Sequence, residues 1–300
     1  MQVLSENMSS FEIVCVNDES NDFESEELLN TFLNAKRLEG RSDKTIARYE
    51  YIIRKMQNSI KTPIRKISVF HLRNYLSNEK VRGVSDSTLD GIRQVLSAYF
   101  GWLQKECLIT VNPAINLSPI KSTKKVRKPY SAIDIEKLKE CCTNNRDRAI
   151  IAILLSTGCR ISEICQLNRN DIDFANKEIT VLGKGNKERT VFIDDVTVML
   201  LQRYLNERKD GYEALFVGKG TDRLKQGGVR KLLHTVADKA GVDNTHPHRF
   251  RRTLATSLID HGMPIQEVAA ILGHEKLDTT MRYVYISKSN VKNSYNKYVG

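Results

Sequence analysis

The sequence predicts a mainly α-helical protein of two domains, with a small antiparallel β-sheet in the second domain. Three observations support this fold class. Apolar residues recur at three- and four-residue steps over much of the chain, as they do on one face of an α-helix. A basic segment without such periodicity, residues 117–129, divides the chain into two parts. In the second part, two β-rich stretches, 177–182 and 188–194, flank a glycine-rich turn that is typical of a hairpin.

The first part of the chain predicts a helical domain behind an acidic leader. We expect residues 1–22 to be a disordered leader and residues 23–116 to form about four helices. Ser42 can cap the start of one helix, and either Ser85 or Ser87 can cap the start of a longer one.

The composition excludes several classes of protein. The apolar and charged fractions, 40% and 28%, are those of a soluble globular protein. No apolar run approaches the roughly 20 residues of a membrane span, and no secretory signal opens the chain, so we expect a cytoplasmic protein without a membrane partner. The six cysteines form no C-x-x-C pair, and we expect reduced thiols and no zinc site.

The charge of the chain points to a polyanionic partner. The net charge is +11, but residues 1–35 contain eight acidic and no basic residues, so the remainder of the chain carries +19. Such an excess suits nucleic acid, because each Lys or Arg placed on a phosphate releases a condensed counterion. Charge alone also fits proteins that bind ribosomes or acidic lipids.

The segment 117–129 is predicted to be a linker. Five of the eight residues from 121 to 128 are basic. It is either a solvated tether or a strap along a DNA backbone. For the second case the candidate DNA-binding residues are Lys121, Lys124, Lys125, Arg127 and Lys128.

Residues 130–300 predict a mixed domain, mainly helical with one small sheet, and four polar clusters lie within it. In the first cluster, a very apolar helix ends at Gly158 and Arg160 follows, three residues before Glu163. The two side chains form either a structural ion pair or a guanidinium held by Glu163 and aimed at a phosphate.

The second cluster is the hairpin tip, where two glycines surround Lys184. It is either an ordinary exposed turn or a mobile lysine that enters a DNA groove. It is not a P-loop, because the spacing and the following helix of that motif are missing.

The third cluster places His248 and Arg251 three residues apart near a helix start, where they share one face and favour an anion. The alternatives are a structural role for His248 and metal binding by His246 and His248. In the fourth cluster, His274 lies at a turn after a helix and Tyr283 lies on the next helix. An isolated tyrosine usually belongs to the core or the surface.

Read in order, these clusters resemble the signature of the tyrosine recombinase (phage integrase) family. The sequence words T-G-C-R-I-S-E, G-K-G-N-K-E-R and L-G-H-x-x-L-x-T-T-x-x-Y look especially like the Xer branch. The resemblance covers essentially the whole chain and implies a two-domain clamp, with a helical core-binding domain, a linker and a catalytic domain. The implied catalytic residues are Arg160, Lys184, His248, Arg251, His274 and Tyr283.

The resemblance also implies a mechanism. Tyr283 would attack a phosphodiester of double-stranded DNA and form a 3′-phosphotyrosyl intermediate, while Lys184 protonates the departing 5′-oxygen. Glu163 would support Arg160 without contacting the substrate. No cofactor, ATP or metal is implied. The family assembles a cyclic homo-tetramer on synapsed DNA, often by passing a C-terminal segment to a neighbour, and the chain could be a monomer in solution. Residues 287–300 are either that exchanged segment or a frayed tail.

The sequence departs from the family in two places. Related sequences often have His where this chain has Arg252, and the acidic leader is extra. Both features favour slightly the integration and excision of a mobile element over Xer-type resolution of chromosome dimers. Tyr285 is an alternative nucleophile, although the spacing from His274 favours Tyr283. A partner recombinase or directionality factor leaves no mark in the sequence.

Three other functions remain open as alternatives. A type IB topoisomerase uses similar chemistry but religates the same strand, so it would relax plasmids that lack a recombination site. A non-catalytic DNA-binding protein would have lost some catalytic positions, and all are filled here. An RNA-binding module fits the charge, but no aromatic-rich RNA-binding motif is present.

Overall fold

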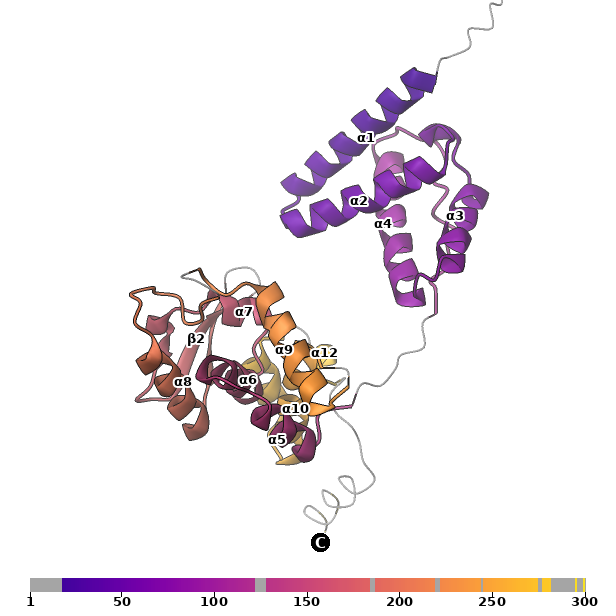
Figure 1. Cartoon of the computed structure of the whole chain (residues 1–300). Coiled ribbons are helices and arrows are strands. Elements are labelled where there is room, and N and C mark those ends of the chain that lie inside the picture. Colours follow the sequence, from indigo (N-terminus) through magenta and orange to yellow (C-terminus); the bar gives the residue numbers. More distant parts are fainter. Residues whose placement is uncertain are drawn as a thin grey trace, which may run out of the picture. The chain divides into compact units, whose positions relative to one another are not determined.

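The computed structural model describes residues 18–121, 128–183, 187–218, 222–243, 245–274 and 277–281, together with residues 295 and 299. The chain divides into two compact units, Met1–Lys125 and Val126–Gly300 (Figure 1). The division falls within the basic segment that the sequence predicts to be a linker. Among the described residues, no helix is long and apolar enough to cross a membrane.

The described residues of the N-terminal unit form helices and the loops that connect them, with no strand. Its helices pack around one apolar core, in which α2 contacts both α1 and α4. Ser85, not Ser87, caps α4 by accepting a hydrogen bond from the Thr88 backbone N–H at 3.4 Å. The elements are α1 (Asp18–Leu38), α2 (Asp43–Ser59), η1 (Ile64–Lys66), α3 (Val69–Val81) and α4 (Asp86–Lys105).

Helix α1 begins earlier than the sequence predicts. It starts at Asp18, inside the segment 1–22 that we expected to be a disordered leader, and residues 1–17 lie outside the described residues. The acidic composition that suggested disorder also suits a helix start, because the macrodipole favours negative charge in the first turns.

The second unit is mainly helical with one small sheet, which confirms the predicted fold class. The three strands pair antiparallel in the order β1-β2-β3, with Ile179 opposite Val191 and Val181 opposite Arg189. The elements are α5 (Ala132–Glu140), α6 (Asn145–Thr157), α7 (Ile161–Gln166), η2 (Arg169–Asp171), β1 (Ile172–Asp173), β2 (Glu178–Leu182), β3 (Glu188–Phe192), α8 (Asp195–Glu207), α9 (Gln226–Ala240), α10 (Pro247–Asp260), α11 (Ile265–Leu272) and α12 (Leu277–Met281).

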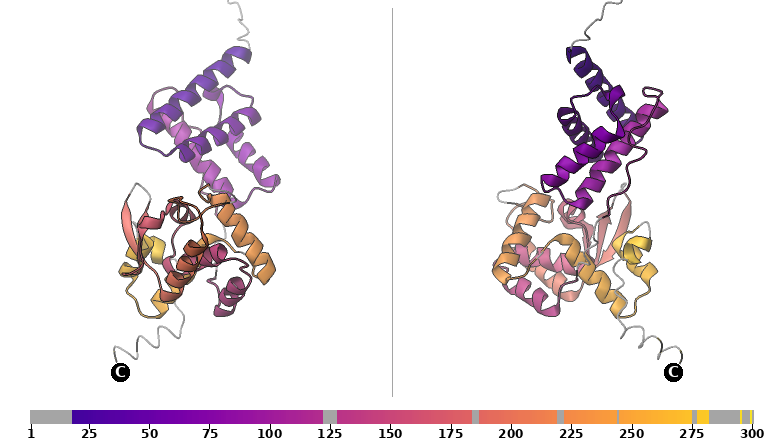
Figure 2. Two further views of the ribbon diagram at one scale, coloured as in Figure 1. Left: turned by 60° about the vertical axis from the view of Figure 1, so that its left-hand side comes forward. Right: turned by 90° about the vertical axis from the view of Figure 1, so that its right-hand side faces the viewer.

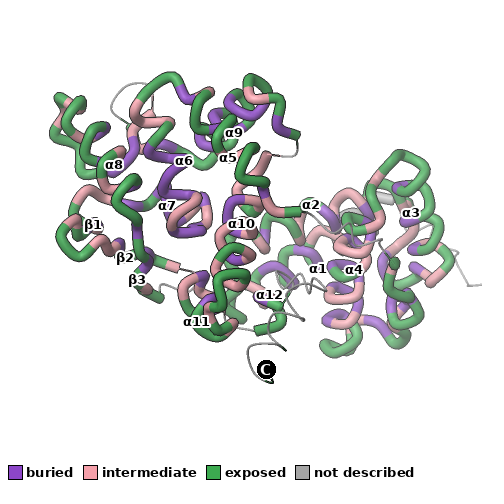
Figure 3. The backbone as a smooth tube through the Cα atoms, turned by 90° about the horizontal axis from the view of Figure 1, so that it is seen from below, coloured by how far each residue is buried: buried purple, intermediate pink, exposed green. Residues whose placement is uncertain are grey.

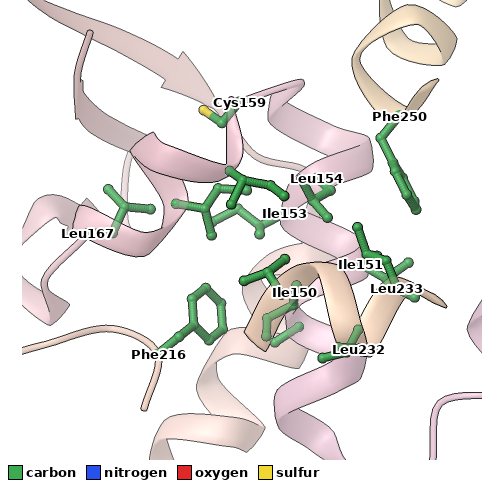
Figure 4. Close-up of a cluster of buried hydrophobic side chains, with 14 of the residues drawn as sticks. Ile150, Ile151, Ile153, Leu154, Cys159, Leu167, Phe216, Leu232, Leu233 and Phe250 are labelled. Carbon is green, nitrogen blue, oxygen red and sulfur yellow. The ribbon is translucent and has the colours of Figure 1, made fainter. Parts of the chain in front are cut away.

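Helix α6 is the centre of this unit. Every residue from Ala149 to Leu154 is buried, and the helix contacts α8, α10 and β3. Figure 3 shows the burial concentrated on α6 and the neighbouring α7. In Figure 4 the side chains of α6 meet Leu232 and Leu233 of α9 and Phe250 of α10. Because α6 is fixed on all sides, its C-terminal end is a rigid place for polar side chains.

Helices α11 and α12 lie beside the sheet. Helix α11 contacts β3 and α10, and both views of Figure 2 show the yellow C-terminal helices next to the pink strands. This packing brings the ends of α6, β3 and α11 together, although they are far apart in the sequence.

Candidate active site

The turn between α6 and α7 presents Arg160. Helix α6 ends at Gly158, whose φ of 59° is left-handed. A methyl group built on Gly158 would lie 3.0 Å from the side chains of both Leu254 and Leu272, so only glycine fits between α10 and α11. Arg160 follows as the first residue before α7 and donates from Nη1 to Glu163 at 2.8 Å.

Arg251 reaches the same turn from α10. Its side chain is buried, with 2% exposed, and it donates from Nη1 to the Gly158 carbonyl at 2.9 Å and from Nη2 to the Leu272 carbonyl. Both acceptors belong to helix C-terminal ends, which carry partial negative charge. Arg251 therefore joins the ends of α6 and α11.

His274 lies two residues after the end of α11, behind the cap residue Gly273. Its ring Nδ1 lies 2.7 Å from the hydroxyl of Thr280 on α12. Burial, followed by the positive charges of Arg251, Arg160 and Arg189, lowers the pKa of His274 to about 4. The ring is therefore neutral near pH 7 and offers one N–H donor.

One turn links these three residues. Arg251 donates to the Leu272 carbonyl, and Arg160 donates from Nη2 to the next carbonyl, that of Gly273, at 3.3 Å. His274 is the next residue. Two guanidinium groups and an imidazole from three different helical segments are thus held around one short stretch of backbone.

Glu163 is buried beneath Arg160, with 3% exposed. Burial alone would raise its pKa, but hydrogen bonds from Arg189 and from the Arg160 backbone lower it to about 2. Arg189, on β3, donates from Nη1 and Nη2 to the two carboxylate oxygens at 2.9 and 2.8 Å. The expected contact between Glu163 and Arg160 is present, and Arg189 completes it.

Arg189 is not among the site residues predicted from the sequence. A signal existed, because Arg189 and the fully buried Val191 are two residues apart on β3 and so point to the same face of the strand. An arginine on the buried face of a strand needs fixed partners.

A hollow of about 180 Å³ lies over this arrangement. It brings together Arg160, His248 and Arg251, three of the predicted catalytic residues. Two residues of α9, Gln226 and Arg230, also line it and were not predicted. The full lining is Cys159, Arg160, Ile161, Ser162, Gln226, Arg230, Pro247, His248 and Arg251.

A second hollow lies outside the predicted site. The space between α5, α6 and α8 is larger, about 350 Å³, but contains none of the predicted catalytic residues. The rings of His246 and His248 lie 6.4 Å apart, and the described part of the chain contains no group of three or more His, Cys, Asp or Glu residues that could hold a metal.

Two predicted catalytic residues, Lys184 and Tyr283, lie outside the described residues. Their neighbours are described. Gly183 follows β2, and its N–H donates to the Lys187 carbonyl at 2.8 Å, which brings the two ends of the hairpin turn together. Thr280, the partner of His274, precedes Tyr283 by three residues in the sequence.

The linker is described only at its ends. Lys121 and Lys128 are exposed, whereas Lys124, Lys125 and Arg127 lie outside the described residues.

The C-terminal end of the linker is fixed to α10. Arg249, next to His248, donates to the carbonyls of Lys128 and Pro129 at 3.2 and 3.3 Å and lies 4.1 Å from the ring centre of Tyr130. Arg252, the departure from the family pattern, is partly buried on the same helix.

Comparison with known proteins gives a consistent result. The model of the phage integrase family matches residues 130–290. The tyrosine recombinase XerC of Corynebacterium glutamicum is 33% identical over 267 residues, which cover 86% of each chain. The tyrosine recombinase XerA of Pyrococcus furiosus is 31% identical over 274 residues, 89% of this chain and 92% of that one.

Solved structures share the fold. The integrase of transposon Tn1549 in complex with a circular intermediate DNA superposes with a TM-score of 0.75 at 21% identity, covering 90% of this chain and 99% of that one. A lambda integrase dimer bound to a core site gives a TM-score of 0.72 at 18% identity, covering 85% and 96% of the two chains.

Proposed function

Because the chain belongs to the phage integrase family and is a site-specific tyrosine recombinase that cleaves and rejoins DNA, we propose how its residues share the reaction. Tyr283 is the nucleophile that attacks the scissile phosphate, and the product is a 3′-phosphotyrosyl bond. Arg160 and Arg251 bind the non-bridging oxygens, with hydrogen bonds from His248 and His274. Lys184 protonates the departing 5′-oxygen.

The physical problem of this reaction is charge. A phosphodiester repels a nucleophile, so the enzyme must neutralise the phosphate, hold the nucleophile in line and supply a proton to the leaving group. A guanidinium has five N–H donors in a planar fork that matches two phosphate oxygens. Because the ring of His274 is neutral near pH 7, its N–H can donate a hydrogen bond to the phosphate without adding a positive charge to the site.

The turn Leu272–Gly273 carries this proposal. Its two carbonyls fix Arg251 and Arg160, and the residue that follows is His274. No single one of these residues indicates catalysis, but two arginines and a histidine held at one turn support it, and both arginines also line one hollow together with His248. By analogy with oxyanion donors, we expect that the loss of either arginine slows cleavage on the order of 10²–10³-fold.

The covalent bond retains the energy of the phosphodiester. The free 5′-hydroxyl of a partner duplex can therefore attack the phosphotyrosine and exchange strands. We propose that two double-stranded DNA sites and four copies of the chain form the active assembly, with residues 287–300 exchanged between neighbours. This segment lies almost entirely outside the described residues, so the proposal rests on the family alone.

The linker residues Lys121, Lys124, Lys125, Arg127 and Lys128, together with Arg252, are proposed to bind the DNA backbone. The anchoring of Pro129 to α10 supports this role, because it fixes the end of the basic segment one residue from His248. Phosphate contacts of this kind add affinity and orientation but no sequence preference.

Two biological uses fit the chemistry: movement of a mobile element and resolution of chromosome dimers. The acidic leader and Arg252 favour the first, and the identity with Xer recombinases favours the second. A second recombinase or a directionality factor can take part in either.

Covalent capture tests the chemistry and the use together. Nicked fragments of the genome that encodes the chain are incubated with the wild type, Tyr283→Phe and Tyr285→Phe, and only DNA that survives denaturing washes is sequenced. We expect the wild type and Tyr285→Phe to retain one family of sequences and Tyr283→Phe to retain none. Equal retention by Tyr283→Phe contradicts the assignment of the nucleophile. The genomic position of the captured site separates the two uses.

A further inference from the structure

Arg189 lies at the point where the elements of the active site meet. Its side chain is 13% exposed, on the buried face of β3, opposite Val181. Besides the two hydrogen bonds to Glu163, its Nε donates to the Ile271 carbonyl at 3.2 Å, in the last turn of α11. A buried guanidinium with this number of fixed partners has one orientation.

Three residues near Arg189 each come directly before a predicted catalytic residue in the sequence. Its Nη2 lies 4.0 Å from the sulfur of Cys159, the residue before Arg160. A methyl group built on Gly273, the residue before His274, would lie 3.0 Å from both Cδ and Nε of Arg189. A methyl group on Gly183, the residue before Lys184, would lie 3.4 Å from Nη1.

The two glycines show how close the backbone comes. At Gly273 a methyl group would crowd the arginine, and this glycine also has a left-handed φ of 64° that favours glycine. At Gly183 a methyl group would be in van der Waals contact with Nη1 and closer, at 3.2 Å, to the Lys187 carbonyl. Arg189 therefore packs against Gly183 and Gly273, the residues that precede Lys184 and His274 in the sequence.

We propose that Arg189 is a positioning residue that aligns Arg160, Lys184 and His274, three catalytic groups carried by three separate segments. The inference rests on the roles assigned to those residues under the proposed function. Arg189 does not touch the DNA. It lies against the residue before each catalytic group, donates to the Ile271 carbonyl in the last turn of α11, and fixes Arg160 through their shared partner Glu163.

Lysine cannot replace arginine in this role. The two oxygens of Glu163 and the Ile271 carbonyl are reached by three different nitrogens of one planar group, whereas a lysine presents one nitrogen. Arg189→Lys therefore keeps the positive charge and removes the alignment. Misplacement of a catalytic group by about 1 Å can slow a reaction about 10²-fold.

The experiment compares two leaving groups. Single-turnover cleavage is measured on a nicked site with an ordinary scissile phosphate, and on the same site with sulfur in place of the bridging 5′-oxygen. A thiolate leaves without protonation, so the sulfur substrate does not need Lys184. We expect Arg189→Lys to cleave the ordinary site about 10²-fold more slowly and to recover at least about tenfold of this loss on the sulfur site, with DNA affinity within about threefold of the wild type.

Arg208→Lys is the matched control. Arg208 is also a buried arginine of the second unit, and it holds Asp210 and the carbonyls of Ala214 and Leu215, but it does not line the hollow. We expect this variant to lose stability and to keep both cleavage rates. A purely structural role would make Arg189→Lys behave in the same way.

Two results overturn the proposal: an ordinary-site rate within about threefold of the wild type, or a loss of equal size on both substrates. If Arg189→Lys does not fold, Gly183→Ala replaces it, because its methyl group would lie between the Lys187 carbonyl, at 3.2 Å, and Nη1 of Arg189, at 3.4 Å, without removing a charge. The same recovery on sulfur is expected, and its absence overturns the proposal.

Tyr283→Phe and Lys184→Ala distinguish this failure from a failure of the proposed function. Tyr283→Phe should form no adduct, and Lys184→Ala should recover on the sulfur site. If either does not, the assigned roles are wrong and the Arg189 proposal falls with them. If both do, and Arg189→Lys matches Arg208→Lys, the Arg189 proposal alone is wrong.

Discussion

Each unit of the chain contains a buried carboxylate held by two cationic side chains. In the N-terminal unit, Glu79 is 0% exposed and pairs with Lys55 and with Arg82 at 2.7 Å. In the second unit, Glu163 pairs with Arg160 and Arg189. The chemistry of the two clusters is nearly the same, but their surroundings differ.

The partners of Glu79 reach it from the solvent side. The side chains of Lys55 and Arg82 are 37% and 63% exposed. Lys55 lies on α2, and Arg82 caps the C-terminal end of α3. The cluster fastens α2 to α3, and none of its three members lines the hollow beside the predicted catalytic residues. Its effect should be on stability.

The partners of Glu163 contact other parts of the candidate active site. Arg160 lines the hollow, and Arg189 contacts the last turn of α11. The ion pair therefore fixes the direction of a guanidinium beside the hollow in which we propose that a phosphate binds. The comparison shows that a buried ion pair alone does not indicate function. The further contacts of its side chains decide whether it can affect a reaction.

Replacement of Glu163 should have the largest effect. In Glu163→Gln the amide has one acceptor oxygen where the carboxylate had two, and its NH₂ group faces a guanidinium donor. We expect single-turnover cleavage of a nicked site to fall on the order of 10²-fold, because Arg160 loses its fixed direction. A rate equal to that of the wild type would show that Glu163 has the same purely structural role as Glu79.

Glu79→Gln should change stability and leave cleavage per folded molecule unchanged. The loss of a buried charged acceptor should lower the free energy of unfolding by about 1–3 kcal/mol. Trp102 is the single tryptophan of the chain and is buried in this unit, so its fluorescence in a urea titration follows this unit alone. Slower cleavage at saturating DNA would mean that Glu79 also acts on the reaction, and the contrast with Glu163 would fail.

Acidification should separate the two units by pH. The folded pKa of His274, about 4, lies below its ordinary 6.5, so between these values the unfolded chain takes up a proton that the folded chain does not. The stability of the second unit should therefore fall as the pH drops from 6.5 to 4. In the N-terminal unit, the pKa values of Glu79 and Asp90 are lowered, that of Asp90 to about 2 by Arg93. The stability that these carboxylates contribute is therefore lost only below about pH 4.5, where they become protonated.

Urea titrations at pH 7, 6 and 5 check this separation. Trp102 fluorescence reports the N-terminal unit and circular dichroism reports both, so the two midpoints should diverge as the pH falls. In His274→Asn the divergence between pH 7 and 5 should disappear. Its persistence would assign the effect to another group.

The smallest effect is expected at two backbone positions, one in each unit. Cys107, just after α4, and Lys177, before β2, have left-handed φ values of 58° and 57°. Cys107→Gly should raise the free energy of unfolding by about 0.5–1 kcal/mol, because glycine has no side-chain clash there. Lys177→Gly should gain less, since it also loses a surface ion pair with Asp195. Thermal unfolding of both variants measures the difference, and a loss of stability in Cys107→Gly would contradict it.

Much of the fold could be predicted from the sequence. Long amphipathic helices such as α2 and α4 and the hairpin β2–β3 have strong periodic or turn signals, and their positions are close to those expected. Helix α7, with six residues, and strand β1, with two, are too short for any periodicity to appear. Their presence is decided by packing against α9 and β2.

The site could be predicted only as a set of residues, and its geometry could not. Arg160, His248 and Arg251 line one hollow, whereas Lys184 and Tyr283 lie outside the described residues. The catalytic roles of all these residues stay predictions. Arg189 was missed because its partner Glu163 is 26 residues away, and no local pattern joins a strand to the turn before a helix. Such contacts follow from the tertiary fold.

The most direct test of the account is to map the residue that becomes joined to DNA. The wild type is trapped on a nicked copy of its own site, digested with trypsin and analysed by fragmentation mass spectrometry. Fragmentation is needed because the tryptic peptide 283–288 contains both Tyr283 and Tyr285. We predict a nucleotide on Tyr283. A nucleotide on Tyr285 or on any other residue would contradict the account.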